Sequence, residues 1–356
     1  MNDDGTPAAP ELRPAPDASE KATSLREITQ HSWRYLLRRT SREFMRDECV
    51  DLAAGLTYHG VLAVLPGLIA LVSVLGVFGQ GARSVDTVLD VAGRVVPAEG
   101  LDIISPILRG VVESSAAAWG LVLGVLGALW FVSGYVGAFG RAMNRVYAVP
   151  EGRPIWKLQP QMILVTAALG VLSVCAVLLL AISGPLARAI GDVFQLGSTV
   201  VWIWNVAKWP VLAGIVVLVV ALLYYITPNV RQPRFRWLSP GAVLAIVTWV
   251  AGSTLFGLYV ANFANFGATY GSLAGVIVFL VWLWVTNIAL LLGAELDAEV
   301  ERARELQAGI GAERTVQLPP RDTRTSRKAA AQHEMDVAAG RKIRDRHEAP
   351  DTRSRQ

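Results

Sequence analysis

The sequence contains few of the residues that build catalytic and metal sites, with two cysteines and four histidines among 356 residues. Cys49 and Cys175 are too few for a disulfide framework, and we expect both to be free thiols. The histidines are scattered and form no zinc-binding pair: His31, His59, His333 and His347. No nucleophile elbow or phosphate-binding glycine loop is present. We therefore expect neither an enzyme nor a bound metal or cofactor.

Charge is also scarce, and it is unevenly distributed. Only 17% of the residues are charged and 53% are apolar, whereas soluble domains are roughly 25% charged. The charges concentrate in residues 1–51 and 296–356, which leaves the middle of the chain almost uncharged. This distribution is typical of a membrane domain between two hydrated tails. No cleavable signal peptide is visible, so the apolar run from Leu52 is expected to direct its own insertion.

Six apolar segments are long enough to cross a bilayer as helices. A helix needs about 20 residues to cross roughly 30 Å of hydrocarbon, and its backbone groups must be satisfied internally. The predicted spans are Leu52–Phe78, Ala117–Phe139, Met162–Gly184, Trp209–Ile226, Pro240–Ala264 and Ser272–Ala294. The sequence therefore predicts an all-α integral membrane protein with a six-helix membrane domain over residues 52–298.

The lysines and arginines predict the direction of these spans. The short loops after the second and fourth spans carry seven of them, whereas the segments on the opposite side carry four. The two basic tails lie on the same side as the seven. We therefore expect both termini to be cytoplasmic.

Two segments outside the spans have a helical apolar periodicity of their own. Residues 84–115 are too charged to span, so we expect outer amphipathic helices there, either a packed cap over the bundle or a gate. Residues 24–51 are expected to form a basic amphipathic helix at the cytoplasmic surface, with one stripe of arginines: Arg34, Arg38, Arg42 and Arg46. These arginines either bind anionic lipid headgroups or only enforce the topology.

Both tails are expected to be largely disordered. Residues 1–23 are rich in proline, alanine and acidic residues, and residues 299–356 are charged with few apolar anchors. The basic runs of the C-terminal tail are expected to be solvated, so we predict no specific binding of nucleic acid.

Polar groups inside the spans are the default candidates for function, because an unpaired polar group in lipid is costly. Tyr58 and His59 lie in the first span, which also contains Pro66, and a proline there predicts a kink. Asn262 ends the fifth span and Asn287 lies in the sixth. His59 is either a packed core histidine or a proton or substrate contact. Asn287 is either a link between helices or part of a ligand site.

Glu295 closes the sixth span at its cytoplasmic edge. Arg141 and Arg145 follow the second span on the same side, so we predict that one of them pairs with Glu295 and latches the inner mouth. The alternative is that Glu295 only favours hydration at the end of its helix.

Four ordered stretches resemble the YihY/BrkB family of bacterial inner-membrane proteins: DLAAGLTYHGVLAVLPGLIALVSVLGVFG, RAMNRVYAVPEGRPIW, YYITPNVRQPRFRWLSPGAVLAIVTW and ATYGSLAGVIVFLVWLWVTNIALLLGAELDAEV. The similarity covers about residues 30–300 and implies a six-span protein of the bacterial plasma membrane. The motif positions that it carries over are Tyr58, Pro66, Asn144, Tyr147, Tyr270, Gly271, Ser272, Gly293 and Glu295. Family members commonly have tyrosine or a similar residue at position 59, which argues against a shared role for the histidine.

Part of this family is labelled a virulence factor, and part carries an old ribonuclease BN name. A metal-dependent ribonuclease needs clustered histidine and carboxylate ligands, which this sequence lacks. The leading hypothesis is instead a transport or lipid-handling protein, an exporter or flippase-like component of the cell envelope without ATP hydrolysis. Its candidate path residues are Tyr58, His59, Pro66, Asn262, Tyr270, Asn287 and Glu295.

The expected partners are the bilayer, anionic lipids and an unidentified small-molecule or lipid substrate, and a homo-oligomer is left open. The alternative function is a non-transporting membrane scaffold that organises partners through its cytoplasmic tails. Loss of the C-terminal tail should abolish the function of a scaffold and spare that of a transporter.

Overall fold

The computed structural model describes residues 13–21, 27, 30–75, 86, 89, 105–106, 117–181, 198–233, 239–263 and 274–348. Within these residues the regular elements are all helices, and one isolated bridge joins Val230 to Pro320. The helices are α1 (Gln30–Arg46), α2 (Cys49–Leu75), α5 (Ala117–Val146), α6 (Ile155–Ala181), α8 (Ser198–Ile226), α9 (Pro240–Phe263), α11 (Ala274–Gln307) and α12 (Arg324–Glu348). The predicted all-α fold is confirmed.

Five of these helices are long and apolar enough to cross a membrane: α5, α6, α8, α9 and α11. Among the residues searched, α2 adds a shorter apolar stretch over Cys49–Val64. These lengths fit the expected integral membrane protein. The outer helices predicted over residues 84–115 and the turn over residues 265–271 lie outside the described residues, apart from four isolated positions.

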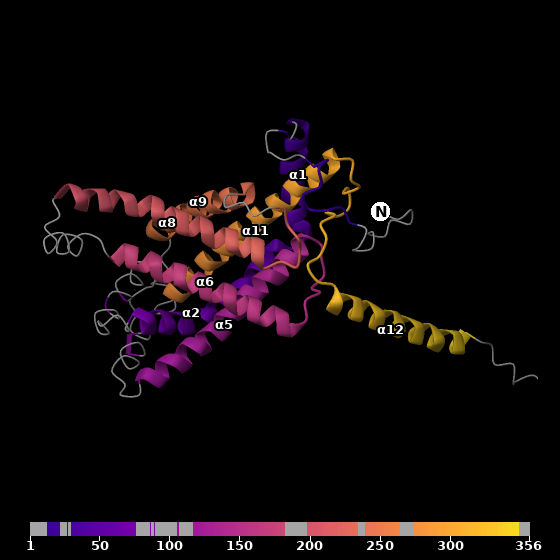
Figure 1. Ribbon diagram of the computed structural model, residues 1–356, viewed down its shortest axis with the longest axis horizontal. Coiled ribbons are helices and arrows are strands. Elements are labelled where there is room, and N and C mark those ends of the chain that lie inside the picture. The colour runs from indigo at the N-terminus through magenta and orange to yellow at the C-terminus, as the bar shows by residue number, and fades with distance from the viewer. Residues whose placement is uncertain are drawn as a thin grey trace, which may run out of the picture.

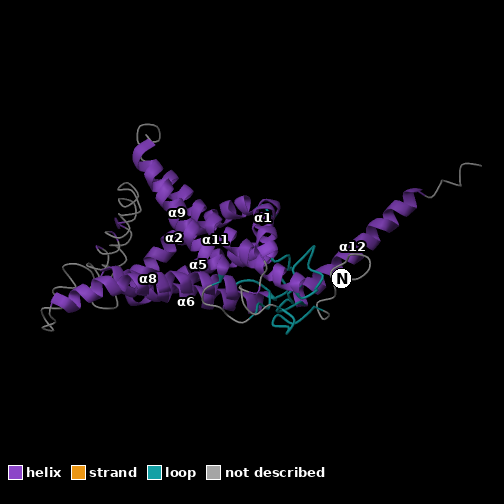
Figure 2. Cartoon of the chain, turned by 90° about the horizontal axis from the view of Figure 1, so that it is seen from above, coloured by secondary structure: helices purple, strands orange, loops and turns teal. Residues whose placement is uncertain are grey.

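By their contacts, the membrane helices form an incomplete ring in the order α9, α11, α2, α5, α6 and α8. Each of them packs against its neighbour in this order, and α11 also touches α5. The ring closes poorly, because α8 and α9 contact each other only slightly. Figure 2 shows these two helices diverging as they leave the end of the bundle where α1 lies.

We call that end the capped end, since it gathers α1, the loops 147–154 and 227–233, and residues 308–323. α1 crosses the bundle axis there (Figure 1) and packs its apolar face on α11. Leu36 of α1 forms a buried cluster with three residues of α11: Leu296, Val300 and Ala303.

Burial is distributed very unevenly along the helices. Among the described side chains, α6 has no buried residue after Thr166, α8 has none before Val220, and α9 has none after Ala245. These three limits all lie near the capped end. By contrast, α2 is buried as far as Ala63, α5 as far as Ala128, and α11 as far as Gly275. The centre of the bundle is therefore formed by α2, α5 and α11, whereas α6, α8 and α9 bury side chains only near the capped end.

Several helices extend beyond the predicted spans at the capped end. α5 continues to Val146, so Arg141 and Arg145 lie in its last turns and not in a loop. α11 continues to Gln307, well past the predicted end at Ala294. Hydropathy marks where a helix leaves lipid, whereas the helix itself continues as long as its backbone bonds and packing are favourable.

The disorder predicted for the N-terminal tail is wrong for residues 13–21, which pack against the extension of α11. Lys21 is only 2% exposed. Its Nζ lies 2.8 Å from Oε1 of Glu301 and 3.1 Å from Oε1 of Glu305. Arg13 donates a hydrogen bond to the carbonyl of Leu318. Amino-acid composition does not reveal such contacts, because a few specific partners, and not the average polarity, hold this segment against α11.

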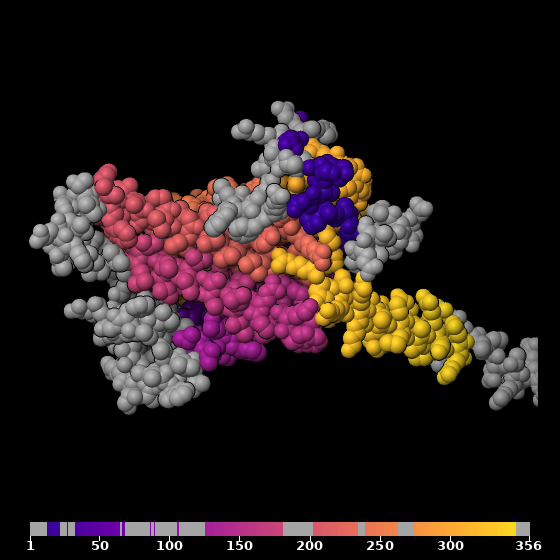
Figure 3. All heavy atoms as spheres, in the orientation of Figure 1, coloured from indigo at the N-terminus to yellow at the C-terminus, as the bar shows by residue number. Residues whose placement is uncertain are grey.

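The disorder predicted for the C-terminal tail is also wrong for residues 299–348. Residues 308–323 return along the capped end and bury Val316 and Leu318. α12 then forms a helix that projects away from the bundle, as the ribbon and the space-filling view both show (Figures 1 and 3). Its described side chains are mostly exposed.

The helices α9 and α11 approach each other closely at two glycines. A Cβ built on Gly241 would lie 2.0 Å from the carbonyl oxygen of Gly293, and one on Gly293 would lie 2.3 Å from the carbonyl oxygen of Gly241. Small residues of this kind let helix backbones pack tightly in lipid. The approach also brings Asp297 to the start of α9, where it accepts a hydrogen bond from the amide of Gly241 at 2.7 Å.

The substitution Gly241→Ala should lower the free energy of unfolding by about 1–3 kcal/mol, because the added methyl group overlaps α11. Gly257→Ala is the matched control on the same helix, since a Cβ there meets nothing within 4 Å. Unfolding of both variants in detergent, followed by circular dichroism, measures the difference. Equal stabilities would show that the contact at Gly241 is not tight.

Candidate functional site

Asn287 joins three helices at the centre of the bundle. It is 0% exposed. Its Nδ2 donates to Oγ1 of Thr57 on α2 at 3.1 Å, and its Oδ1 accepts from the hydroxyl of Tyr135 on α5 at 2.8 Å. The amide is thus used in contacts between helices. Of the two roles considered for Asn287, the structure supports the link between helices.

The other candidate path residues do not join this cluster. Tyr58 is 64% exposed, and its ring makes an edge contact with His59 at 5.7 Å between centroids. Asn262 is exposed and donates to the carbonyl of Leu258 in its own helix. Pro66 lies inside α2, which continues through it to Leu75. Tyr270 lies outside the described residues.

The predicted latch between Glu295 and an arginine is wrong. Arg145 pairs with Glu48 at 2.7 Å, in the link between α1 and α2. Glu295 instead lies against Cys49, with 3.4 Å between Oε1 and Sγ. Among the described residues Arg141 forms no ion pair, although its charge acts on His59. The latch fails because α1 and the start of α2 occupy the space beside Glu295. Cys49 and Cys175 are free thiols, as predicted.

The arginines of α1 are placed where lipid headgroups would meet them. Arg34, Arg38 and Arg42 are exposed, and none forms an ion pair among the described residues. Arg46 lies 3.5 Å from Glu43. The same outer face of α1 exposes Leu37 and Met45. Exposed apolar and basic side chains on one face are typical of a helix lying at a membrane surface, so binding of anionic lipid stays a prediction.

A buried network of amides ties the capped end together. The backbone N–H of Asn229 donates to Oδ1 of Asn144 at 2.7 Å, and the side chain of Asn229 donates to the carbonyls of Pro150 at 3.0 Å and Asp322 at 2.8 Å. Asn144 in turn donates to Glu151 at 2.9 Å. Three segments far apart in sequence therefore meet at Asn229.

Two arginines complete this network by satisfying the end of α8. The last carbonyls of a helix have no partner within the helix and carry partial negative charge. Arg153 donates to the carbonyl of Thr227 at 2.7 Å. Arg321 donates to the carbonyl of Tyr225 in the last turn of α8, and at 2.8 Å to the carbonyl of Val230 in the loop that follows. We call this group, with Asn144, Glu151 and Asn229, the loop clasp.

Glu151 is the acidic member of the loop clasp. Burial raises the pKa of its carboxyl, but the hydrogen bonds from the side chain and backbone of Arg153, the charge of Arg153 and a hydrogen bond from Asn144 outweigh burial and hold the pKa below its usual value. Arg153 approaches both oxygens, with Nε 2.9 Å from Oε1 and an Nη nitrogen 2.7 Å from Oε2. This is the two-point geometry in which arginine binds carboxylates most strongly.

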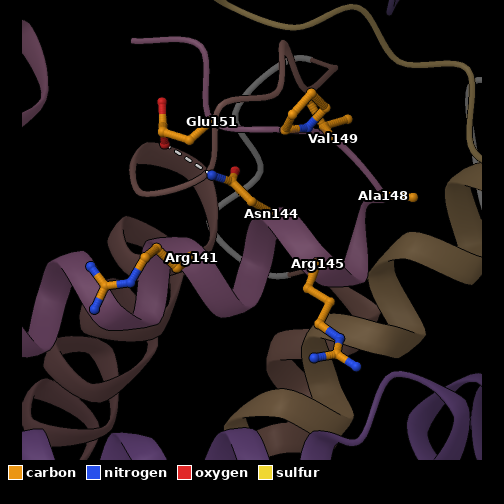
Figure 4. A pocket seen from close by; sticks show the side chains of 7 residues that line it. Arg141, Asn144, Arg145, Ala148, Val149 and Glu151 are labelled. Atoms are coloured by element: carbon orange, nitrogen blue, oxygen red, sulfur yellow. Dashed lines mark hydrogen bonds between the residues drawn. The ribbon is translucent and has the colours of Figure 1, made fainter. Parts of the chain in front are cut away.

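A pocket of about 390 Å³ lies beside the loop clasp and is lined by Arg141, Asn144, Arg145, Ala148, Val149, Pro150 and Glu151. Figure 4 shows that the two arginines point away from the Asn144–Glu151 pair and from each other. Because their guanidinium groups do not converge, the pocket offers no common point at which both would hold one anion.

Most of the loop clasp was not predicted from the sequence. Asn144 was expected to matter through the family resemblance, but no role was predicted for Arg153, Asn229 or Arg321. The available signal was the position of Asn229, which directly follows an apolar run and a proline. Arg321 gave no signal, because its partners lie in a loop far away in the sequence.

The substitution Asn287→Ala should lower the free energy of unfolding by about 1–3 kcal/mol, because it removes two hydrogen bonds between helices. Asn262→Ala is the matched control, since that amide bonds only within its own helix. Unfolding in detergent or bilayers compares the two variants. A smaller effect at position 287 than at position 262 would contradict the proposed junction.

The low pKa of Glu151 predicts a pH dependence. A carboxyl with a lowered folded-state pKa stabilises the protein above its unfolded pKa, and this stabilisation is lost as the pH falls through the folded value. The folded protein should therefore lose stability below about pH 4.3. In Glu151→Gln this part of the loss should be missing, as pH-dependent unfolding curves would show. Identical curves for the two proteins would contradict the role of the carboxylate.

The chain is similar to a known family of membrane proteins. The family model described as virulence factor BrkB matches residues 40–317. The chain is 31% identical over 255 residues to the ribonuclease-like protein YfkH of Bacillus subtilis (strain 168), which covers 71% of this chain and 90% of YfkH. It is 27% identical over 286 residues to a UPF0761 membrane protein of Alkalilimnicola ehrlichii, which covers 76% of this chain and 60% of that protein.

A UPF0761 membrane protein of Aromatoleum aromaticum is similar at 28% identity over 295 residues, 77% of this chain and 67% of that protein. No solved structure shows significant similarity. The family match includes nearly all of the bundle and the returning segment as far as Gln317. The resemblance drawn from the sequence is confirmed, and the chain belongs to the BrkB family of membrane proteins.

Proposed function

We propose that this protein is a transport or lipid-handling component of the bacterial plasma membrane, exporter- or flippase-like and without ATP hydrolysis of its own. The observation that carries the proposal is the unequal burial of the helices. α6, α8 and α9 bury side chains only near the capped end. A bundle that served only as an anchor would gain most from packing along the full length of its helices.

The helices with the least buried length are neighbours in the ring. α6 lies next to α8, and α8 has only slight contact with α9. Large apolar side chains are exposed on these helices, as at Trp202 and Trp209 of α8 and Leu255 of α9. A bundle with one side open to the hydrocarbon admits an acyl chain laterally, so an amphipathic or lipid substrate fits this arrangement better than a small ion does.

The loop clasp and α1 form the closed floor of the proposed path. In this proposal the capped end faces the cytoplasm, as the distribution of lysine and arginine predicts. The arginines of α1 then lie at the anionic cytoplasmic leaflet. The path is closed on the cytoplasmic side and open toward the bilayer.

Purified protein in liposomes should transfer fluorescent phospholipid between leaflets severalfold faster than empty vesicles, because the open side shields the headgroup during passage. Dithionite quenching of the outer leaflet measures the rate, and small-anion flux is measured in parallel. Heat-unfolded protein at the same density is the control. Rates equal to those of empty vesicles, with and without a proton gradient, would contradict the proposal.

The exposed helix α12 favours a second candidate, a scaffold that binds partners outside the membrane. The two functions separate in a deletion of residues 324–356, which removes α12 but keeps the packed segment 308–323. A transporter should keep most of its transfer rate after this deletion, whereas a scaffold should lose its cellular function. A deletion from residue 308 is unsuitable, because it also removes Arg321 from the loop clasp.

A nuclease, suggested by the name of the Bacillus subtilis relative, has less support. Among the described residues no group of three or more histidine, cysteine or carboxylate side chains is placed to hold a metal ion. We therefore propose no catalytic residue.

A further inference from the structure

Glu295 is a buried carboxyl that lacks a cationic partner. It is 1% exposed and lies at the capped end of α11. Its Oε1 is 3.4 Å from Sγ of Cys49, and a thiol is a weak hydrogen-bond donor. Among the described residues no lysine or arginine forms an ion pair with it. Burying an unpaired carboxylate costs far more than burying the neutral acid, so this environment favours the protonated form.

A second carboxyl, that of Asp47, faces Glu295 from the link between α1 and α2. Asp47 lies two residues before Cys49, whose thiol contacts Glu295, and the carboxyl of Asp47 interacts with that of Glu295. Two ionised carboxylates at such a site repel each other, whereas one proton shared between them removes the repulsion. The neighbouring acid therefore reinforces what the burial of Glu295 already favours, a bound proton.

The charges around the pair are already matched to one another. Glu43 lies 3.1 Å from Arg39, and Glu299 lies 2.9 Å from Arg302. The other charged or titratable groups that face the pair come from α1, α2, α5, the following loop and α11: Arg46, Glu48, Cys49, Arg145, Tyr147 and Asp297. Glu48 forms an ion pair with Arg145, and Asp297 accepts a hydrogen bond from Ser239. Among the described residues, no cation therefore pairs with Glu295.

The electrostatics of Asp47 agree with this geometry. Burial raises the pKa of Asp47 and repulsion from Glu43 raises it further, whereas the interaction with Glu295 and the charges of Arg145 and Arg46 act in the opposite direction. When two neighbouring acids interact in this way, a proton belongs to the pair and not to one residue.

We propose that Asp47 and Glu295 together form a site that binds one proton at neutral pH and joins the α1–α2 link to α11. Loss of the proton leaves two facing carboxylates, which repel and push the link away from α11. The movement has a natural pivot at Glu48, whose φ of 54° is unusual for a residue other than glycine. In the transport function proposed above, on which this role alone rests, the proton is the coupling ion that opens the capped end.

The sign of the pH effect follows from linkage. The folded protein keeps a proton that the unfolded chain has already released, so the equilibrium constant for folding falls as the pH rises. For one proton the fall approaches about tenfold per pH unit. The wild-type protein in nanodiscs should therefore become less stable between about pH 5.5 and pH 9, a range chosen to begin above the ordinary carboxyl pKa values.

Glu295→Gln tests the site directly, because the amide resembles the protonated acid and can donate to Asp47. This variant should lose the part of the pH dependence that the shared proton contributes, and it should exceed the wild type in stability at high pH. Glu301→Gln is the matched control, being buried on the same helix but paired with Lys21 at 2.8 Å and with Arg304. It should be less stable than the wild type at every pH and should keep the wild-type slope. Equal slopes for the wild type and Glu295→Gln would overturn the proposal.

A second measurement does not depend on the folding of a variant. Infrared spectra of the wild-type protein at neutral pH should show the carbonyl band of a protonated carboxyl, which disappears on raising the pH. Asp47→Asn should remove the band, because its amide donates to an ionised Glu295. Absence of the band in the wild type would overturn the proposal. Neither measurement involves transport, so failure of the site is distinguishable from failure of the lipid-transfer assay.

Discussion

The C-terminal carbonyls of α8 have no partners in their own helix, and the capped end of the bundle is built around satisfying them. Arg153, from the loop after α5, and Arg321, from the segment after α11, supply donors to the same helix end. The position of Arg153 is fixed by Glu151, and Asn229 links the loops to the returning chain. Three chain segments thus converge at one helix end that requires donors from outside its own helix, and Gln161 of α6 and Gln232 supply further ones.

This constraint also explains why burial is uneven. Polar contacts between segments need water-free, close packing, and these contacts are concentrated at the capped end. Further along, α6, α8 and α9 have apolar surfaces that lipid satisfies as well as protein does, so nothing requires them to pack together. The same physics leaves a closely packed capped end and a side on which α8 and α9 have only slight contact. The function that we propose uses this difference.

Sequence reasoning succeeded where the property in question is local. The apolar runs gave the membrane helices, although α5 and α11 continue beyond them. Asn287 was identified as a candidate link because an amide in lipid needs a partner. The latch between Glu295 and Arg145 was wrong, because the choice among nearby acids depends on where α1 crosses the bundle. The prediction that both tails are disordered was wrong for the same reason. Lys21, for example, is held by two carboxylates about 280 residues away in the sequence.

The spans and the scarcity of charge at the centre of the chain were determined by the sequence alone, because transfer of a helix into lipid depends on its own residues. Only the tertiary structure decided which carboxyl meets which cation, because pairing depends on distances between segments that are remote in sequence. Glu48, Glu151 and Glu299 each gained an arginine. Glu295 instead lies beside a thiol and a second carboxyl, and no property of the sequence distinguishes it from the other three.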